Sequence, residues 1–166
     1  DADSVTGSEA RDVVSADFLD DASTGLGDDW VEGAGSVSGG EGNDTLRDAS
    51  GNSVVDGGTG ADNLYAEGSS FLAGGKGDDV IEATGMASVI AQNAGDGNDV
   101  VRASSQQVTV SLGGQLDYDE LKLRKDGANL VMETSSGDST TFEGWYDAGT
   151  AKPQYLTLQV MTSAMD

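Results

Sequence analysis

A short phrase recurs five times between residues 25 and 101, and it restricts the fold more than any other feature of the chain. Each copy reads Gly-x-Gly-x-Asp-x-aliphatic, where x varies between copies. The copies occupy residues 25–31, 40–46, 58–64, 75–81 and 95–101. Glycine permits turns with positive φ, the aspartate supplies a carboxylate, and the aliphatic residue can enter a core. The repetition therefore predicts stacked turns with their carboxylates in a row.

The period of the phrase identifies the kind of stack. A degenerate earlier copy, GSEARDVVS, places Asp12 in the aspartate slot, and successive aspartates are then 17, 15, 18, 17 and 20 residues apart. A period near 18 suits one coil of a β-solenoid. We expect the spacings of 17 and 20 to reflect small insertions on the edge that lacks aspartates. The aliphatic slot holds Val14, Val31, Leu46, Leu64, Ile81 and Val101.

The other half of each coil lacks the carboxylate. Its inward positions fall about nine residues after the first set, at Val37, Val55, Leu72 and Ile90. Where a second aspartate would stand, the chain has Ser53, Ser70 and Ser88. Serine can hydrogen-bond a turn but brings no charge for a divalent ion. We therefore predict one metal-binding edge and one metal-free edge.

The character of the chain changes near residue 107. Alternating runs such as VTVSL, ELKLRK and YLTLQV are separated by turn signals, and most aromatic residues lie here. An open solenoid end must be capped. We predict an all-β chain with two parts: a parallel solenoid over residues 1–106, and a small antiparallel β cap over 107–166 with Trp145 and Tyr146 in its core.

Composition limits the partners and the chemistry. The net charge is −22, from 30 acidic and 8 basic residues, which disfavours nucleic acid and anionic membranes and favours hard cations. The chain has no cysteine and no histidine, so disulfides, zinc sites and Cys-His or Ser-His-Asp catalysis are excluded. No apolar run is long enough to span a membrane. Because the first residue is Asp rather than Met, we expect a piece of a longer polypeptide.

The repeated turn has the chemistry of a calcium site. Ca²⁺ takes about 6–8 oxygen ligands from carboxylates and carbonyls, more than one such turn can supply. Two turns stacked roughly 4.8 Å apart can supply them together. Mg²⁺ requires tighter octahedral geometry and fits less well.

Three complete copies, GGEGNDTLR, GGTGADNLY and GGKGDDVIE, begin at Gly39, Gly57 and Gly74. They resemble the nonapeptide of RTX (repeats-in-toxin) proteins, a Ca²⁺-binding β-helix signature. The tail from VTVSLGGQL to EGWYD resembles the haemolysin-type calcium-binding related region that follows such repeats. The resemblance implies a right-handed parallel β-roll of about 18 residues per coil, with Ca²⁺ between neighbouring turns.

Transferred to this chain, the resemblance assigns the aspartate and the backbone carbonyls of five turns, 24–29, 39–44, 57–62, 74–79 and 94–99, as ligands. Four gaps imply about four Ca²⁺ ions, or five if Asp12 contributes. The expected metal residues are Thr24, Gly25, Leu26, Gly27, Asp29, Gly39, Gly40, Glu41, Gly42, Asp44, Gly57, Gly58, Thr59, Gly60, Asp62, Gly74, Gly75, Lys76, Gly77, Asp79, Gly95, Asp96, Gly97 and Asp99.

Some residues depart from the pattern. Thr24 and Ala94 replace the first glycine, which is tolerable where no positive φ is needed. Ser8 and Ala10 replace glycines in the 7–12 copy, which puts a site there in doubt. The acidic neighbours Asp28 and Asp78 are expected to face solvent. The cluster of Asp17, Asp20 and Asp21 is interpreted as a solvated loop in preference to a further ion site.

The function expected from the resemblance is that of a non-catalytic Ca²⁺-binding module of a larger bacterial protein. The parent would be an adhesin, exoprotein or toxin of a Gram-negative bacterium, exported by a type I system to the outside or the cell surface. The module would fold on binding Ca²⁺ and contact other domains of its parent. As a fragment it would be monomeric, with no nucleic acid and no membrane insertion.

Two other functions were weighed. An ice- or surface-binding β-solenoid would carry a regular row of one small residue, but the third turn position reads Leu26, Glu41, Thr59, Lys76, Asp96. A polysaccharide-acting β-helix enzyme would need a groove with catalytic bases and wider coils than single inward aliphatics allow.

Overall fold

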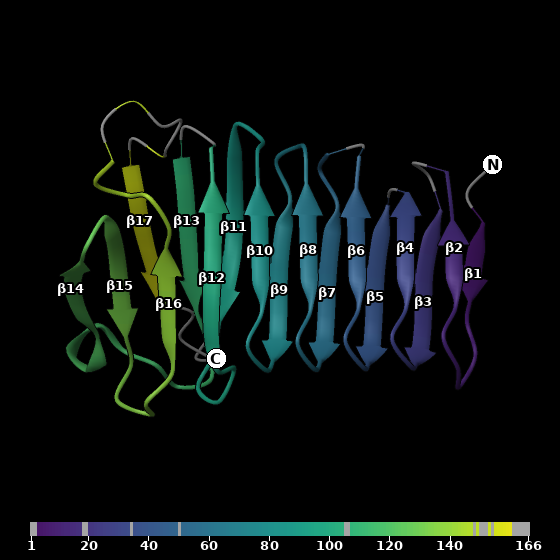
Figure 1. Ribbon diagram of the computed structural model, residues 1–166, viewed down its shortest axis with the longest axis horizontal. Helices are drawn as coiled ribbons and strands as arrows, with labels where there is room; N and C mark the ends of the chain where they lie inside the picture. The colour runs from purple at the N-terminus through teal and green to yellow at the C-terminus, as the bar shows by residue number, and fades with distance from the viewer. Residues whose placement is uncertain are drawn as a thin grey trace, which may run out of the picture.

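The chain folds into a β-solenoid whose coils stack along one long axis (Figure 1). The structure is a computed structural model, and it describes residues 3–17, 20–33, 35–49, 51–104, 107–147, 149, 153 and 155–160. The helical content of these residues is one 3₁₀ turn, η1 (Tyr118–Glu120), and none of their helices is long and apolar enough to cross a membrane. The predicted all-β class is confirmed.

Two sheets face each other, and the described residues form eight strands in one and nine in the other. The first sheet contains, in spatial order, β1 (Ser4–Thr6), β3 (Asp21–Leu26), β5 (Ser36–Glu41), β7 (Val54–Thr59), β9 (Phe71–Lys76), β11 (Ala87–Gln92), β13 (Gln107–Leu112) and β17 (Tyr155–Val160). The second contains, in spatial order, β14 (Lys122–Asp126), β15 (Asn129–Glu133), β16 (Ser139–Phe142), β12 (Asn98–Ala103), β10 (Val80–Ala83), β8 (Asn63–Ala66), β6 (Thr45–Asp48), β4 (Trp30–Gly33) and β2 (Val13–Ser15).

A thin apolar core fills the space between the sheets. The aliphatic residue of each repeat pairs in register with its equivalent in the next coil, as in Val31 with Leu46 and Leu46 with Leu64. The predicted inward residues of both half-coils are at most 8% exposed. Because the strands β2 to β10 each bury only one or two residues, no single coil there has a core of its own. Each coil depends on its neighbours for burial.

The two edges of the solenoid contain different turns. The repeated glycine turns join a strand of the first sheet to the next strand of the second, β3 to β4, β5 to β6, β7 to β8 and β9 to β10, along the lower edge of Figure 1. We call this the aspartate edge. The return connections run along the opposite edge, where Ser53, Ser70 and Ser88 are buried.

One expectation about coil length is wrong. Ala91 pairs with Ala73, so Gln92 follows in the strand position held by Gly74 one coil earlier. Two extra residues, Asn93 and Ala94, then separate Gln92 from the turn glycine Gly95. Two residues of the 20-residue spacing therefore lie on the aspartate edge, where none was expected. Relative to the preceding coil, one further residue lies on the opposite edge, since Ile81 and Ile90 are nine residues apart and Leu64 and Leu72 eight. Residue spacing alone gives the length of a coil but not which edge holds the extra residues.

Parallel stacking continues through the C-terminal part of the chain. β13 pairs parallel with β11, β16 with β12 and β17 with β13, so the pairing crosses the proposed boundary between residues 106 and 107. The antiparallel portion of the described cap is the unit β14–β15–β16. This unit and η1 are inserted between two strands that extend the stack.

The aromatic residues of the cap divide between core and surface. Trp145 packs against the core and meets Phe142 edge to face, with ring centroids 6.0 Å apart. Tyr146 was predicted to belong to the same core, and this is wrong, since it is 43% exposed. The Lys125 ammonium lies 4.7 Å from the centroid of its ring, a cation–π contact that suits a surface aromatic.

The thin core makes one stability prediction. Leu64 is fully buried in a central coil, whereas Leu123 on the edge strand β14 is 54% exposed. In saturating Ca²⁺, Leu64→Ala should lower the free energy of unfolding by about 2–5 kcal/mol because it leaves a cavity. Leu123→Ala should change it by less than about 0.5 kcal/mol. Urea unfolding measures both, and equal losses would contradict the assignment of the core.

Candidate metal centre

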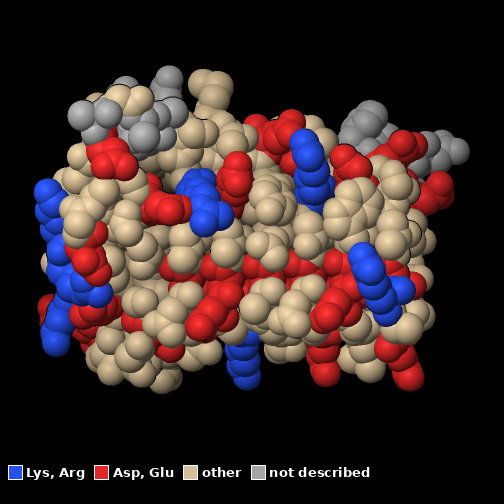
Figure 2. Space-filling view, in the orientation of Figure 1, with Lys and Arg blue, Asp and Glu red and all other residues tan. Residues whose placement is uncertain are grey.

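Five aspartates form a buried row along the aspartate edge. Asp29, Asp44, Asp62, Asp79 and Asp99 occupy equivalent places, at or just before the start of a strand of the second sheet, and are at most 4% exposed. Figure 2 shows acidic side chains gathered in a row that runs along the length of the solenoid. A column of buried carboxylates without neighbouring cationic side chains is costly in a folded protein. The arrangement therefore requires a compensating interaction.

One oxygen of each carboxylate is used to join the coils. The backbone N–H of each aspartate donates to Oδ1 of the aspartate in the next coil. These N···O distances are 2.7 Å for Asp12 to Asp29, 2.8 Å for Asp29 to Asp44, 2.7 Å for Asp44 to Asp62, 2.8 Å for Asp62 to Asp79 and 3.1 Å for Asp79 to Asp99. These bonds fix the direction of the side chains.

The second oxygen lacks such a partner. Oδ2 of Asp29, Asp44, Asp62 and Asp79 is buried and accepts no hydrogen bond from any described residue. An unpaired buried carboxylate oxygen costs more than a neutral group left in the same position. Four such atoms in register are therefore four sites at which positive charge would be strongly stabilising.

Burial also changes the acidity of the row. Desolvation raises the pKa of Asp62 to about 7, of Asp79 to about 6 and of Asp99 to about 7. It raises the pKa of Asp44 as well. Neighbouring carboxylates add to the rise, and the backbone N–H bond to each group opposes it. Without a cation, the folded chain thus holds these groups more readily as neutral acids.

Glycines at the second and fourth turn positions allow the turns to stack closely. All ten have positive φ: Gly25, Gly27, Gly40, Gly42, Gly58, Gly60, Gly75, Gly77, Gly95 and Gly97. A Cβ on Gly58 would lie 2.1 Å from the Gly40 carbonyl oxygen, and one on Gly60 would lie 1.8 Å from the Gly42 oxygen. Other residue types would strain the turn and separate the coils.

Glycine at the first turn position has a different purpose. Gly39, Gly57 and Gly74 are not in the positive-φ region, so their backbone would admit a side chain. However, a Cβ on Gly39 would lie 2.2 Å from Asp44 Oδ2 and 2.6 Å from the Gly57 carbonyl oxygen of the next coil. The same position on Gly57 lies 2.4 Å from Asp62 Oδ2 and 2.4 Å from the Gly74 oxygen. These glycines keep clear a space on which a carboxylate and a carbonyl converge.

The donor set fits a hard cation. Carboxylate and carbonyl oxygens are the ligands that Ca²⁺ prefers, and here they come from successive coils. No group of three or more acidic side chains gathers closely enough to hold a metal among the described residues, so the carboxylates need backbone oxygens beside them. The four unpaired Oδ2 atoms supply the charge for such sites.

Residues at the third turn position stabilise the stack through their carbonyls. The N–H of Gly27, Gly42, Gly60 and Gly77 donates, respectively, to the carbonyl oxygens of Glu41, Thr59, Lys76 and Asp96 in the next coil. The side chains of Leu26, Glu41, Thr59 and Lys76 are exposed. These predicted ligand positions therefore already hold hydrogen bonds between turns.

The last predicted turn differs from the others. Asp96 is 7% exposed, and its Oδ2 accepts the backbone N–H of Asn93 at 2.6 Å. The N–H of Gly95 donates to Asp138 Oδ2 in the cap at 2.7 Å. Ala94, predicted to begin this turn, is exposed in the two-residue insertion. The turn is thus joined both to its own strand and to the cap.

The degenerate first turn has already satisfied its carboxylate. Oδ2 of Asp12 accepts the backbone N–H of Ser8 at 2.6 Å and the Ser8 hydroxyl at 3.1 Å. Ser8 stands where the second glycine of the phrase would be. The unpaired oxygen that marks the other turns is therefore not present at Asp12.

The remaining acidic residues behave differently from the row. Asp28 and Asp78 are exposed, as predicted, and accept the backbone N–H of Asn43 and Asn98 at 2.8 Å. Asp20 accepts the N–H of Asp3 and of Asp17, which lowers its pKa. Asp17 and Asp20 thus lie in a hydrogen-bonded loop, whereas Asp21 is the first residue of β3.

One buried carboxylate on the opposite edge was not anticipated. Asp48 is fully buried, and its carboxylate accepts the Ser70 hydroxyl at 2.8 Å and the Gly51 N–H at 3.1 Å. It pairs in register with Ala66, the small residue of the next coil. An aspartate in an alanine slot was the available signal. Hydroxyl and amide donors satisfy its carboxylate on an edge that has no ligand turns.

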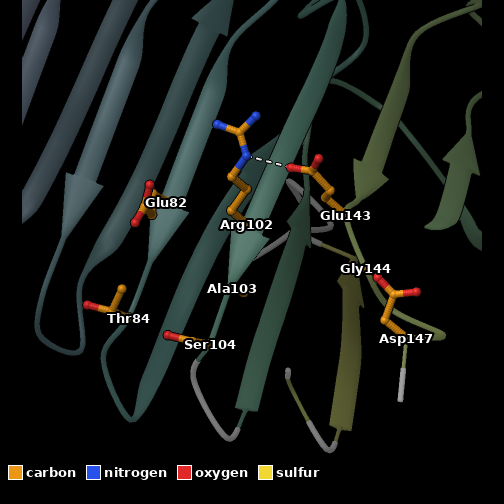
Figure 3. Close-up of a pocket in the computed structure, with 8 residues that line it drawn as sticks. All are labelled: Glu82, Thr84, Arg102, Ala103, Ser104, Glu143, Gly144 and Asp147. Carbon is orange, nitrogen blue, oxygen red and sulfur yellow. Dashed lines mark hydrogen bonds and ion pairs between the residues drawn. The ribbon is translucent and has the colours of Figure 1, made fainter. Parts of the chain in front are cut away.

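The outer face of the second sheet contains a shallow groove beside the cap (Figure 3). Arg102 and Glu143 point toward one another and form an ion pair, with Glu82 and Thr84 on one side and Asp147 on the other. The groove lies away from the glycine turns. The side chains of Arg102 and Glu143 are half exposed and paired with each other, unlike the carboxylates of the aspartate row.

The comparisons with known proteins place the central coils in a family. Residues 38–69 and 66–85 match the family model described as RTX calcium-binding nonapeptide repeat (4 copies). These segments contain the turns 39–44, 57–62 and 74–79, the three that begin with glycine. Among curated proteins, no relative matched the chain. The central coils, residues 38–85, are therefore similar to RTX calcium-binding nonapeptide repeats.

Proposed function

We propose that the chain is a non-catalytic module that binds Ca²⁺ between the turns of its aspartate edge and folds as it does so. The observation that carries this is the register of buried, unpaired Oδ2 atoms beside glycines that keep a space clear. The match of the same coils to calcium-binding repeats supports it. The ligands would be the aspartate row together with backbone carbonyls of the turns 24–29, 39–44, 57–62, 74–79 and 94–99.

Coupling to folding follows from charge and core size. The chain has a net charge of −22, and each of the strands β2 to β10 buries only one or two residues. Bound Ca²⁺ would supply positive charge to the row and so offset the repulsion between stacked carboxylates. Since the sites exist only when coils are stacked, the free energy of binding is also free energy of folding.

The same coupling supports a role outside the cell. Free Ca²⁺ is scarce inside cells and millimolar outside, so such a chain would cross an export channel unfolded and fold after release. We propose a module of a secreted or surface RTX protein of a Gram-negative bacterium, an adhesin, exoprotein or toxin exported by a type I system. Its partners would be Ca²⁺ and other domains of the parent, and the fragment would be monomeric.

Calcium dependence of the fold is the first test. In EDTA at pH 7.5 the chain should lack the β signal in far-UV circular dichroism, and Ca²⁺ should restore it cooperatively. Mg²⁺ at the same concentration should restore little of it, because it keeps its waters in a flexible carbonyl site. A full β signal in EDTA would contradict the coupling.

Two adjacent aspartates offer a matched test of the row. Asp79 is 1% exposed with an unpaired Oδ2, whereas Asp78 is exposed and faces solvent. Asp79→Asn should raise the Ca²⁺ concentration at half folding by roughly tenfold or more, by analogy with losses at metal sites. Asp78→Asn removes the same charge and should shift it far less. Equal shifts would show that net charge, and not the row, controls binding.

The raised pKa values predict that folding without Ca²⁺ and the binding of Ca²⁺ depend on pH in opposite directions. Asp62, Asp79 and Asp99 have folded pKa values of about 7, 6 and 7, above the ordinary 3.8. Without Ca²⁺ their contribution favours the folded chain most below about pH 4 and is lost as the pH rises to 7. In EDTA, the β signal should therefore increase on acidification from pH 7.5 to 4.5.

Ca²⁺ binding should follow the reverse trend, since the carboxylates must lose protons to bind. The Ca²⁺ midpoint should rise by on the order of tenfold or more between pH 7.5 and 5.5. Titration by circular dichroism at both pH values measures it. A midpoint that does not change with pH would contradict a role for these groups.

A further inference from the structure

The first turn position forms a column of its own along the aspartate edge. The strand register places Thr24, Gly39, Gly57, Gly74 and Gln92 at this position in successive coils. A side chain here would point into the gap toward the next coil, as the Cβ position on Gly39 shows by its approach to Gly57 O. Gly39, Gly57 and Gly74 therefore leave their gaps open, whereas Thr24 and Gln92 fill theirs. Gly7 holds the same position in the first coil, but the Asp12 Oδ2 beside it already accepts the Ser8 N–H.

Thr24 fills the gap between turns 24–29 and 39–44. It is fully buried, and its hydroxyl donates to the Gly39 carbonyl oxygen at 2.8 Å. The Gly39 oxygen is the equivalent of the Gly57 and Gly74 oxygens that face the open positions in the next two gaps. In this gap the Gly39 carbonyl oxygen thus accepts a hydrogen bond from the Thr24 hydroxyl, where a cation would otherwise bind.

Gln92 closes the other end of the column. It is fully buried, and its Oε1 accepts the hydroxyl of Thr140 in the cap. Its Nε2 is also buried and has no hydrogen-bond partner among the described residues. Thr140 itself pairs with Asp99 in register, so a hydroxyl takes the aspartate position in the coil after Asp99.

We propose that Thr24 is a built-in plug that ends the calcium ladder, so that Ca²⁺ occupies three gaps: 39–44 with 57–62, 57–62 with 74–79, and 74–79 with 92–99. The count of four expected from the number of turns becomes three. This proposal rests on the proposed function. Asp29 retains an unpaired Oδ2 in the first gap, but the gap lacks the free carbonyl and the space that the glycine turns provide.

The test is the number of bound ions. The 166-residue chain is folded in Ca²⁺, dialysed to remove excess, and its Ca²⁺ content is measured by elemental mass spectrometry and by native mass spectrometry. The unaltered chain should hold three ions. Thr24→Gly should open the first gap, expose Asp29 Oδ2 and the Gly39 carbonyl to it, and hold four. Thr24→Ser keeps the hydroxyl and should remain at three.

A variant that moves the plug tests the idea in the other direction. Gly57 needs no positive φ, so Gly57→Thr should close the gap between turns 57–62 and 74–79 as Thr24 closes its own, and lower the count to two. This result stands even if Thr24→Gly does not fold.

The possible outcomes separate the plug from the function. Four ions in both the unaltered chain and Thr24→Gly would overturn the plug and leave calcium binding intact. An unchanged count in Gly57→Thr would also overturn it. No bound Ca²⁺ in the unaltered chain would overturn the proposed function itself.

Discussion

The unpaired Oδ2 atoms of four stacked aspartates, Asp29, Asp44, Asp62 and Asp79, are the constraint on which the rest of this structure depends. Each carboxylate uses Oδ1 to accept the N–H of the preceding coil, and that bond directs Oδ2 into a dry gap. The hydrogen bond that aligns the coils thus also aligns their negative charges. A core of single aliphatic residues offers little to offset the repulsion between these charges. The stability of the stack therefore depends on whether a cation or a proton donor occupies each gap.

Glycine serves three separate requirements in one turn, which explains why the phrase is so invariant within the chain. At the second and fourth positions it provides positive φ and close contact with the carbonyl of the preceding coil, as at Gly58 over Gly40. At the first position it provides space alone. The exceptions are therefore informative. Thr24 fills its gap in a turn of the common length, and Gln92 fills its gap next to a two-residue insertion.

The sequence was sufficient for the parts that repeat and insufficient for those that do not. The stacking, the inward residues and the aspartate row follow from the period of about 18 residues, because the same residue types recur at the same positions in successive coils. The two extra residues before Gly95 and the surface position of Tyr146 have no second copy to fix them. Asp48 was missed because a buried acid on the serine edge depends on a partner, Ser70, one coil away.

The cap shows why the row ends where it does. β16 and β17 extend both sheets by one more parallel strand, so the last repeats meet a surface of matching geometry. The strand that follows β16 in the sheet is the antiparallel β15, and not the strand of another repeat coil. An aspartate in β16 would therefore have no ligand turn facing its Oδ2. The chain has Thr140 there, whose hydroxyl is satisfied by the Gln92 amide. Parallel pairing thus continues beyond the last carboxylate of the row. The row of proposed calcium gaps ends inside a continuous stack, with the neutral side chain of Thr24 at one end and that of Thr140 at the other.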